Sequence, residues 1–311
     1  MEKNVKILSI NISEKKGESK KNINEVFLKK GGIENDAHFN TKNREISFLD
    51  IESIKRFENL TNRKIYFGEF AENITTEGLN YKSIQPLDIL YNDMVEILIT
   101  QIGKTCHGNT CNIFKLVGKC IVPEEGLFGR ILKEGIIKVG DLLYVKKKKF
   151  KIGVLTLSDR AYNKMYEDKS GPKIIELLNL FFKENNYLSE IDYKVIPDNE
   201  ILLEGMINKY IENSYDLIFT TGGTGIGSKD ITINVISKNL TKEIPGLMNE
   251  IRHKSAKINK NALISRSIAG TINKTLIFCL PGNLKSITEY FEEIKKHLLH
   301  LIYMVNDLDI H

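Results

Sequence analysis

The chain has 311 residues, about twice a typical domain, so we expect two domains that each bury a core. Hydrophobic residues make up 41% and charged residues 27%, as in globular proteins, and with no membrane-length apolar stretch and no signal-peptide segment we expect a cytoplasmic protein without a membrane partner. The net charge of +5 is small and the lysines are scattered, which argues against nucleic-acid binding.

Short strands separated by turn residues dominate the first half. Strands are predicted at residues 5–10, 94–101 and 141–145, and a short helix at 51–59. This pattern favours a mostly β barrel with small helices. The four lysines at 146–149 are interpreted as a solvated boundary, so the domains are predicted as residues 1–147 and 148–311.

Three of the four cysteines lie between positions 106 and 120, which favours chemistry or a metal over a disulfide framework. A thiolate is the nucleophile and sulfur carrier, and Lys104, His107 and Lys115 are close enough in sequence to lower the pKa of a nearby thiol. A zinc site is the alternative, although these residues lack the closely spaced pair of cysteines that is typical of structural zinc sites. Its ligands would be Cys106, His107, Cys111 and Cys120. Cys120 alone also fits a buried, inert thiol.

Several motifs of this half resemble the MOSC domain, the module shared with the C-terminal part of molybdenum cofactor sulfurases. They are Gly-Gly-x3-Asp-Ala-His at 31–38, Gly-Glu-Phe-Ala-Glu-Asn-Ile-Thr-Thr at 68–76, Thr-Gln-Ile-Gly-Lys at 100–104 and Gly-Leu-Phe-Gly-Arg at 126–130. The resemblance implies that this half binds a molybdopterin-type cofactor such as the molybdenum cofactor. It also implies sulfur carriage on a cysteine, with Cys111 as the first candidate and Cys106 as the second.

Other polar residues of this half have open roles. Asp36 and His38 are either ligand contacts or a turn cap. Glu69, Glu72 and Asn73 are interpreted as turn and barrel-rim residues rather than acid/base catalysts.

Strands and helices alternate in the second half. Strands are predicted at 151–157, 191–196, 217–219 and 275–280, and helices at 199–211, at 231–237, from 284 onward, and after an N-cap at Ser170 with Pro172 in the first turn. In the helix at 199–211, the predicted inward positions include Ile201 and Leu202. The alternation predicts a three-layer α/β domain with a largely parallel sheet covered on both faces.

The segment 216–230 is an apolar strand that breaks into four glycines, at 222, 223, 225 and 227. Glycine tolerates positive φ and leaves backbone amides uncovered, so the loop is suited to an anion or a polar ring. The sequence matches neither a P-loop nor the dinucleotide fingerprint. A glycine-rich turn without a ligand is the alternative.

Ligands of parallel sheets gather at the carboxyl ends of the strands, and the residues there are polar. The candidate binding residues at the predicted strand ends are Ser158, Asp159, Arg160, Thr221, Gly222, Gly223, Thr224, Gly225, Pro281, Gly282, Lys285 and Ser286. Lys285 and Ser286 open a helix, where amides and the dipole favour a phosphate. The carboxylates Asp198 and Asp230 complete the set.

These blocks, with Asp-Lys-Ser-Gly-Pro at 168–172, Glu-Ile-Pro-Gly at 243–246 and Ile-Ser-Arg at 264–266, resemble the molybdopterin adenylyltransferase family over residues 150–305. The resemblance implies transfer of AMP from ATP to the terminal phosphate of molybdopterin with Mg²⁺ and release of pyrophosphate, and it places the essential carboxylates at Asp198 and Asp230. Carboxylates that hold Mg²⁺ suit this chemistry. Helix N-caps are the alternative role for both residues.

The expected function is therefore molybdenum cofactor biosynthesis by a nucleotidyltransferase, a molybdopterin adenylyltransferase, fused to a MOSC-like domain. The expected partners are molybdopterin, ATP and other proteins of that biosynthesis, and the resemblance favours a homotrimer. The alternatives are a non-catalytic molybdopterin-binding or carrier protein, a cofactor sulfurtransferase whose second domain only binds ligand, and a generic two-domain nucleotide-binding protein.

Overall fold

The structure is a computed structural model that describes residues 4–16, 18–105, 114 and 120–308. The chain divides into two compact units, and the division falls between Lys148 and Lys149. Among the described residues, no helix is long and apolar enough to span a membrane.

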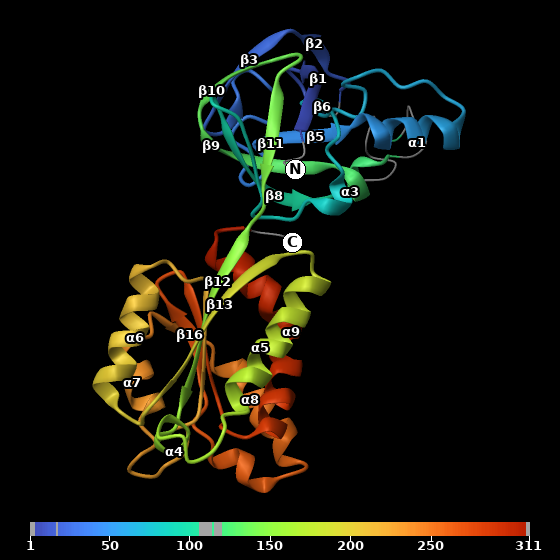
Figure 1. The fold of residues 1–311 in the computed structure, drawn as a ribbon. Coiled ribbons are helices and arrows are strands. Elements are labelled where there is room, and N and C mark those ends of the chain that lie inside the picture. The colour runs from blue at the N-terminus through green and yellow to red at the C-terminus, as the bar shows by residue number, and fades with distance from the viewer. Residues whose placement is uncertain (1–3, 17, 106–113, 115–119, 309–311) are drawn as a thin grey trace. The chain divides into compact units, whose positions relative to one another are not determined.

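The first unit is built around a closed β-sheet (Figure 1). In hydrogen-bonding order, its strands are β11 (Leu142–Lys146), β7 (Ile89–Tyr91), β8 (Glu96–Ile102), β9 (Leu127–Lys133), β5 (Ile46–Asp50), β6 (Ile74–Glu77) and β1 (Asn4–Ile12). β1 also pairs with β11, which closes the sheet into a barrel. The prediction of a mostly β barrel is confirmed.

Smaller elements complete this unit. β2 (Lys21–Ile23) extends the sheet beside β1, and β10 (Gly135–Lys138), β3 (Glu25–Lys29) and β4 (Gly32–Ile33) form a separate ribbon. Helical segments bounded by described residues are α1 (Ile51–Thr61), η1 (Tyr81–Ser83) and α3 (Val122–Glu125). Asp50 begins α1 because its carboxylate accepts a hydrogen bond from the Ser53 amide at 2.5 Å. Fully buried aliphatic and aromatic side chains such as Ile7, Phe48 and Ile97 fill the barrel.

The lysine run at the end of the barrel is more than a solvated boundary. Lys147 donates a hydrogen bond to the buried carboxylate of Asp88 at 2.6 Å, and the backbone amide of Lys148 donates to the same carboxylate at 2.8 Å. This carboxylate therefore ties the end of the barrel to the segment that precedes β7.

The second unit has three layers (Figure 1). Its sheet has the order β13 (Leu188–Ile196), β12 (Lys149–Leu157), β14 (Leu217–Thr221), β17 (Thr275–Leu280), β16 (Ala269–Ile272) and β15 (Lys242–Glu243). The first four strands are parallel, β16 pairs antiparallel with β17, and β15 pairs antiparallel with β16. β14 and β17 are buried along their whole length, which explains the apolar runs at 217–219 and 276–280 within them. The predicted largely parallel α/β architecture is confirmed.

Helices cover both faces of this sheet. One face carries α6 (Glu200–Glu212) and α7 (Thr232–Asn239), and the other carries α5 (Ser170–Glu184), α8 (Pro245–Ala256) and α9 (Leu284–Val305). Two short segments, α4 (Asp159–Tyr162) and η3 (Lys260–Ile264), lie in the connections. α8 was not predicted from the sequence; the proline of Glu-Ile-Pro-Gly occupies the first turn of this helix.

Two details of the helix predictions are wrong. Ser170 is the first residue of α5 and not its N-cap; the carboxylate of Asp168 instead accepts hydrogen bonds from the amides of Ser170 and Gly171 at 2.9 and 3.0 Å. In α6, Ile201 is 80% exposed and Leu202 is 48% exposed. The buried face of α6 consists of Leu203, Ile207 and Tyr210, which are spaced by four and three residues.

Candidate functional site

The carboxyl ends of the parallel strands form a pocket of about 360 Å³ in the α/β unit. The predicted site residues that line it are Ser158, Asp159, Arg160, Asp198, Thr221, Gly222, Gly223, Asp230 and Gly282. Thr156, Leu157, Tyr166, Ser170 and Lys229 complete its lining. Residues from β12, β13, β14 and β17 meet here because parallel strands bring their carboxyl ends to one edge of the sheet. We call this the carboxylate pocket.

Asp159 and Asp198 hold the ends of β12 and β13 together. The Asp159 amide donates to the Asp198 carboxylate, and the Asp198 amide donates to the Asp159 carboxylate, each at 3.1 Å. Partial burial, and then the nearby negative charges of Asp159 and Asp230, raise the pKa of Asp198 above its ordinary value. Asn199, rather than Asp198, caps α6 by accepting from the Leu202 amide at 3.0 Å. The capping alternative for Asp198 is therefore wrong.

Asp230 supports the glycine loop from its far end. Its carboxylate accepts a hydrogen bond from the Gly227 amide at 2.8 Å, and α7 begins two residues later at Thr232. A Cβ atom at Gly225 would lie 2.7 Å from the Asp230 carboxylate, which explains why glycine is needed there. The carboxylate is directed at the loop rather than at the first turn of α7, so the capping alternative is wrong here as well.

The two glycines after β14 have positive φ angles, +94° at Gly222 and +62° at Gly223. A Cβ atom at Gly222 would lie 2.3 Å from the Leu157 carbonyl oxygen, and one at Gly223 would lie 2.5 Å from the Thr232 hydroxyl. Both positions therefore require glycine. The Gly222 amide donates to the Leu280 carbonyl at 3.2 Å, so this amide is already used within the sheet, contrary to the expectation that it faces a ligand.

Lys229 is a pocket residue that the sequence analysis missed. Its ammonium group lies 2.5 Å from the Asp159 carboxylate, and its side chain is 76% exposed. The hydrogen bond lowers the pKa of Asp159 and raises that of Lys229. A basic residue beside Asp230 in a glycine-rich loop was the available signal. Lys229 thus brings a positive charge beside the carboxylates of Asp159 and Asp198.

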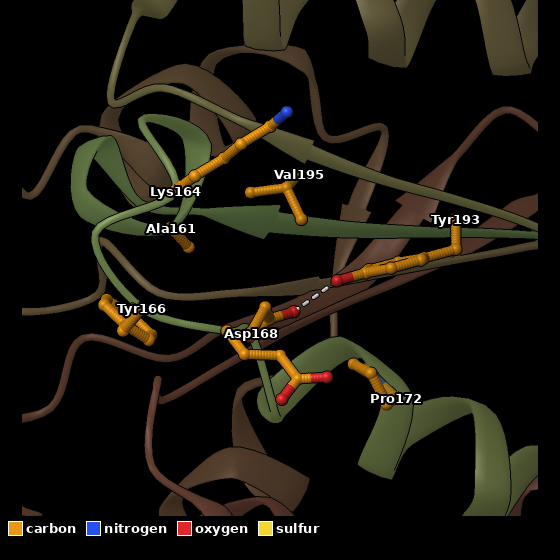
Figure 2. A pocket seen from close by; sticks show the side chains of 8 residues that line it. Ala161, Lys164, Tyr166, Asp168, Pro172, Tyr193 and Val195 are labelled. Atoms are coloured by element: carbon orange, nitrogen blue, oxygen red, sulfur yellow. Dashed lines mark hydrogen bonds between the residues drawn. The ribbon is translucent and has the colours of Figure 1, made fainter.

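A second pocket of about 510 Å³ adjoins the first. Its lining residues are Ala161, Lys164, Tyr166, Glu167, Asp168, Pro172, Tyr193 and Val195. Figure 2 shows Ala161 and Tyr166 on one side and Tyr193 and Pro172 on the other. Tyr166 lines both pockets. We call this the tyrosine pocket, and the sequence analysis did not anticipate it.

Asp168 fixes the wall of the tyrosine pocket. Its carboxylate accepts hydrogen bonds from the Tyr193 hydroxyl at 2.5 Å (Figure 2) and from the Thr156 hydroxyl at 2.7 Å, besides the two amides of α5. Burial opposes ionisation, but the hydrogen bonds from Tyr193 and Thr156 outweigh it and hold the pKa of Asp168 below its ordinary value. Burial and this carboxylate together raise the pKa of Tyr193.

The remaining predicted residues lie outside the carboxylate pocket. Pro281, Lys285 and Ser286 line a neighbouring hollow of about 230 Å³. The Ser286 amide donates to the Asn283 side chain at 2.9 Å, which caps α9 and removes one amide from an anion site. Thr224 is buried, and Gly225 packs against Asp230. The role of Lys285 and Ser286 in phosphate binding stays a prediction.

The donor chemistry of the carboxylate pocket fits one Mg²⁺ ion. Asp198 and Asp230 are near enough for the charge of one to raise the pKa of the other, and Mg²⁺ commonly takes one or two carboxylates together with phosphate and water oxygens. Within the described part of the chain, no group of three or more His, Cys, Asp or Glu side chains is arranged to hold a metal alone. Phosphate oxygens would have to complete the coordination.

The hydrogen bonds around Asp36 in the barrel unit indicate a structural role for this residue. The carboxylate of Asp36 accepts from the Lys20 ammonium at 2.5 Å and from the amides of Ser13 and His38 at 3.1 and 3.0 Å. Burial opposes its ionisation, but hydrogen bonds from His38 and Lys20 hold the pKa of Asp36 well below its ordinary range. These contacts favour the turn-anchoring interpretation of Asp36 over ligand contact.

Glu72 is not a rim residue, because it is 2% exposed. One carboxyl oxygen accepts from the Gly68 amide at 2.6 Å and from the Thr75 hydroxyl at 2.9 Å, while the other has no hydrogen-bond partner among the described residues. Burial raises the pKa of Glu72.

The candidate cysteines are only partly open to structural description. Cys106 and Cys111 lie outside the described residues, as do His107 and Lys115. Cys120 is half-buried beside the cluster around α1 and α3. The sulfur-carrier and zinc hypotheses therefore stay predictions.

Comparisons with known proteins concern the α/β unit. The family described as "Probable molybdopterin binding domain" matches residues 153–300. Molybdenum cofactor biosynthesis protein B of Staphylococcus aureus (strain MRSA252) is 37% identical over 157 residues, which cover 49% of this chain and 90% of that protein. Gephyrin of Dictyostelium discoideum is 34% identical over 166 residues, which cover 52% of this chain and 23% of gephyrin. A solved structure, the crystal structure of the tungsten cofactor synthesizing protein MoaB from Pyrococcus furiosus, matches this chain with 33% sequence identity and a TM-score of 0.46. The match covers 51% of this chain and 99% of that protein chain.

Proposed function

Because the chain belongs, through residues 153–300, to the family of probable molybdopterin binding domains, we propose that it is a molybdopterin adenylyltransferase of molybdenum cofactor biosynthesis. It transfers AMP from ATP to the terminal phosphate of molybdopterin. The observation that carries the proposal is the meeting of Asp198, Asp230 and the glycine loop in one pocket at the strand ends. A carrier protein would need the binding loop but not the paired carboxylates.

The reaction needs positioning more than covalent chemistry. An oxygen of the terminal phosphate of molybdopterin attacks the α-phosphorus of ATP, and a new phosphorus–oxygen bond forms. The bond from the α-phosphorus to the oxygen that bridges to the β-phosphorus breaks, and pyrophosphate leaves with the electron pair. The attacking phosphate oxygen is already ionised at neutral pH, so no protein base has to remove a proton. Alignment and charge compensation are the protein's contributions.

The residues of the carboxylate pocket divide this work. Asp198 and Asp230 would hold Mg²⁺, which when bound neutralises phosphate charge and makes the α-phosphorus more electrophilic. Lys229 and Arg160 bring positive charge to the same pocket and attract the phosphates. Gly222 and Gly223 let the backbone approach them without side-chain obstruction.

Incubation of the purified protein with molybdopterin, ATP and Mg²⁺ tests the proposal. Pyrophosphate release and a mass increase equal to one adenylyl group on molybdopterin are expected. Asp198→Asn and Asp230→Asn should each lower kcat/KM by about 100-fold or more, because each removes a group that compensates transition-state charge. Glu204→Gln, an exposed change on α6, is the matched control and should leave the rate unchanged. Molybdopterin binding by the wild type without pyrophosphate release would favour a carrier.

For the barrel unit we propose cofactor binding with sulfur carried on Cys111. The MOSC-like motifs support this proposal. When a protein persulfide is added as the donor, its outer sulfur passes to the thiolate and the donor leaves as a thiol; this persulfide formation should be lost in Cys111→Ser and retained in Cys120→Ser. If Cys111→Ser still forms the persulfide and transfers sulfur, the barrel is a binding platform or uses Cys106.

A further inference from the structure

We propose that β13, the edge strand of the α/β unit, pairs with the same strand of a second copy of the chain around a two-fold axis at Tyr193. The two strands would run antiparallel and would join two sheets into one. The inference goes beyond the proposed function, because it concerns the edge of the sheet and not the carboxylate pocket. It rests on the open edge of β13, the direction of its backbone groups and the order of its charged side chains.

The outer edge of β13 is long and regular. Within the described part of the chain, β13 pairs with β12 alone, and this pairing runs from Leu188 to Ile196 without a register shift. The strand contains no proline. Proline, bulges and short length are common features that keep an edge strand from pairing with another chain. Because β13 has none of these three, its outer edge is suited to accept a further strand.

A hydrogen bond at the end of β13 shows which of its backbone groups face outward. The Ser158 amide, which follows β12, donates to the Ile196 carbonyl at 3.0 Å, so the backbone groups of Ile196 face β12. The N–H and C=O groups of one residue point to the same side, and this side alternates along a strand. Tyr193 and the residues at 191 and 195 therefore present both groups at the outer edge. The Tyr193 ring lies against α5, where its hydroxyl donates to Asp168, and leaves this edge open.

The charged residues of β13 select one register. Outward-facing residues must lie opposite one another in an antiparallel pair, so the two-fold axis passes at a residue and not between two residues. With the axis at Tyr193, Asp192 of each copy lies opposite Lys194 of the other. An axis at Asp192 or Lys194 would place identical charges opposite each other, and an axis at 191 would place Glu190 opposite Asp192. An axis at 195 would pair Tyr193 with Pro197, which has no N–H group. Opposite charges across a strand pair stabilise it, and like charges destabilise it.

The charged side chains are placed to reach a partner. The side chains of Asp192 and Lys194 are 34% and 40% exposed, and their charged atoms lie 3.9 Å apart within one strand, beyond hydrogen-bond distance. Because their backbone groups face β12, Asp192 and the opposite Lys194 would form a non-hydrogen-bonded pair, in which the side chains approach most closely. On the other face of the joined sheet, Ile191 would pack against Val195 of the partner subunit.

Native mass spectrometry and sedimentation velocity of the full-length protein test the inference. A two-fold contact is separate from the homotrimer that the resemblance implies, and it doubles the mass of whatever assembly the chain otherwise forms. The wild type should show this doubled species. Lys194→Glu and Asp192→Lys should each raise the dissociation constant of the doubling step by about 30-fold, because two ion pairs change from attraction to repulsion. Glu176→Lys, an exposed charge reversal on α5, is the matched control and should pair as the wild type does.

A mixture of the two variants separates pairing between copies from effects within one copy. Lys194→Glu has negative charges at 192 and 194, and Asp192→Lys has positive charges at both positions. The two variants therefore complement each other across the axis, although each has lost its own pair of opposite charges. The mixture should regain the doubled species with one variant on each side of the axis. The double variant Asp192→Lys/Lys194→Glu should also regain it, because the reversed charges again lie opposite each other.

Three results would overturn the inference. The first is a wild type without the doubled species, whose edge would then be left to an unrelated extended segment. The second is undiminished doubling by both single variants. The third is a mixture that does not regain the doubled species that the single variants have lost. None of these measurements needs molybdopterin, ATP or Mg²⁺, so failure of the proposed function and failure of this inference are distinguishable.

Discussion

Asp168 should contribute strongly to the stability of the α/β unit, and Asp168→Asn measures that contribution. The carboxylate joins three segments, because it accepts hydrogen bonds from Thr156 on β12, from Tyr193 on β13 and from the first two amides of α5. Asparagine has the same shape but only one oxygen. Its amino group must face a donor, whichever way the side chain is rotated.

The expected loss follows from these contacts. In the better orientation of the substituted side chain, its oxygen keeps Thr156, Tyr193 and the Gly171 amide, and its amino group faces the Ser170 amide. One hydrogen bond to a charged group is lost and the others become neutral, so we expect the free energy of unfolding to fall by about 3 kcal/mol. Tyr193→Phe removes a single donor and should cost about 1.5 kcal/mol.

Native-state hydrogen exchange resolves the two units of the chain and is the suitable assay. The slowest amides of β12 and β14 should exchange faster in Asp168→Asn, and those of β5 and β8 in the barrel should not change. The pKa of Asp168 is lowered in the folded state, so its contribution is present above the ordinary value of 3.8 and is lost as the pH falls below it. The difference between the wild type and Asp168→Asn should therefore shrink in acid. Unchanged exchange in β12 and β14 at neutral pH would refute this account of Asp168.

Three further predictions follow from buried groups and from the glycine loop. Lys20→Met should lower the stability of the barrel by about 3 kcal/mol, because it leaves the buried carboxylate of Asp36 without its ion-pair partner; adding Asp36→Asn should recover part of the loss in the same exchange assay, and no recovery would mean that the charge is not the cause. Burial raises the pKa of Glu72, so the protonated carboxyl group contributes to the stability of the barrel below pH 4.5, and this contribution is lost as the pH rises through the folded-state pKa. The stability of Glu72→Gln relative to the wild type should therefore rise between pH 4.5 and 8. A constant difference in stability would contradict this. Gly222→Ala should lower the stability of the α/β unit by about 2 kcal/mol and should also lower the rate of adenylyl transfer, because it places a methyl group against the end of β12 at a φ of +94°. The control is Gly205→Ala on α6, where nothing lies within 4 Å of the added Cβ atom. This variant should retain full activity.

Local sequence patterns were sufficient to predict much of the α/β unit. Thr275–Leu280 is read from the sequence because every residue of this strand is buried, so its side chains are apolar without alternation. The polar residues that follow such strands meet at one edge through a rule of parallel sheets, and the structure places Asp198 and Asp230 together accordingly.

Contacts between segments that are distant in the sequence could not be predicted from local patterns. The hydrogen bond from Tyr193 to Asp168 joins positions 25 residues apart, and no local pattern indicates that a strand tyrosine and a loop carboxylate share a pocket wall. The inward face of α6 was misassigned because Ile201 and Leu202 are apolar residues of its first turn, and packing against the sheet selected Leu203 instead. Lys285 lines a separate hollow, and the start of a helix alone does not show which hollow a residue faces; its predicted role in phosphate binding stays a prediction.

The charges of the carboxylate pocket indicate why this arrangement suits a cation-dependent reaction. Asp159, Asp198 and Asp230 lie close enough for two of them to raise the pKa of the third, and Lys229 compensates only Asp159 directly. Two phosphate-bearing substrates would add further negative charge, and like charges a few ångströms apart repel strongly when water is excluded. Under the proposed function, a cation that both the carboxylates and the phosphates bind would offset this repulsion, in addition to the positive charges of Lys229 and Arg160. Binding of the metal and alignment of the reacting phosphates would then be a single event.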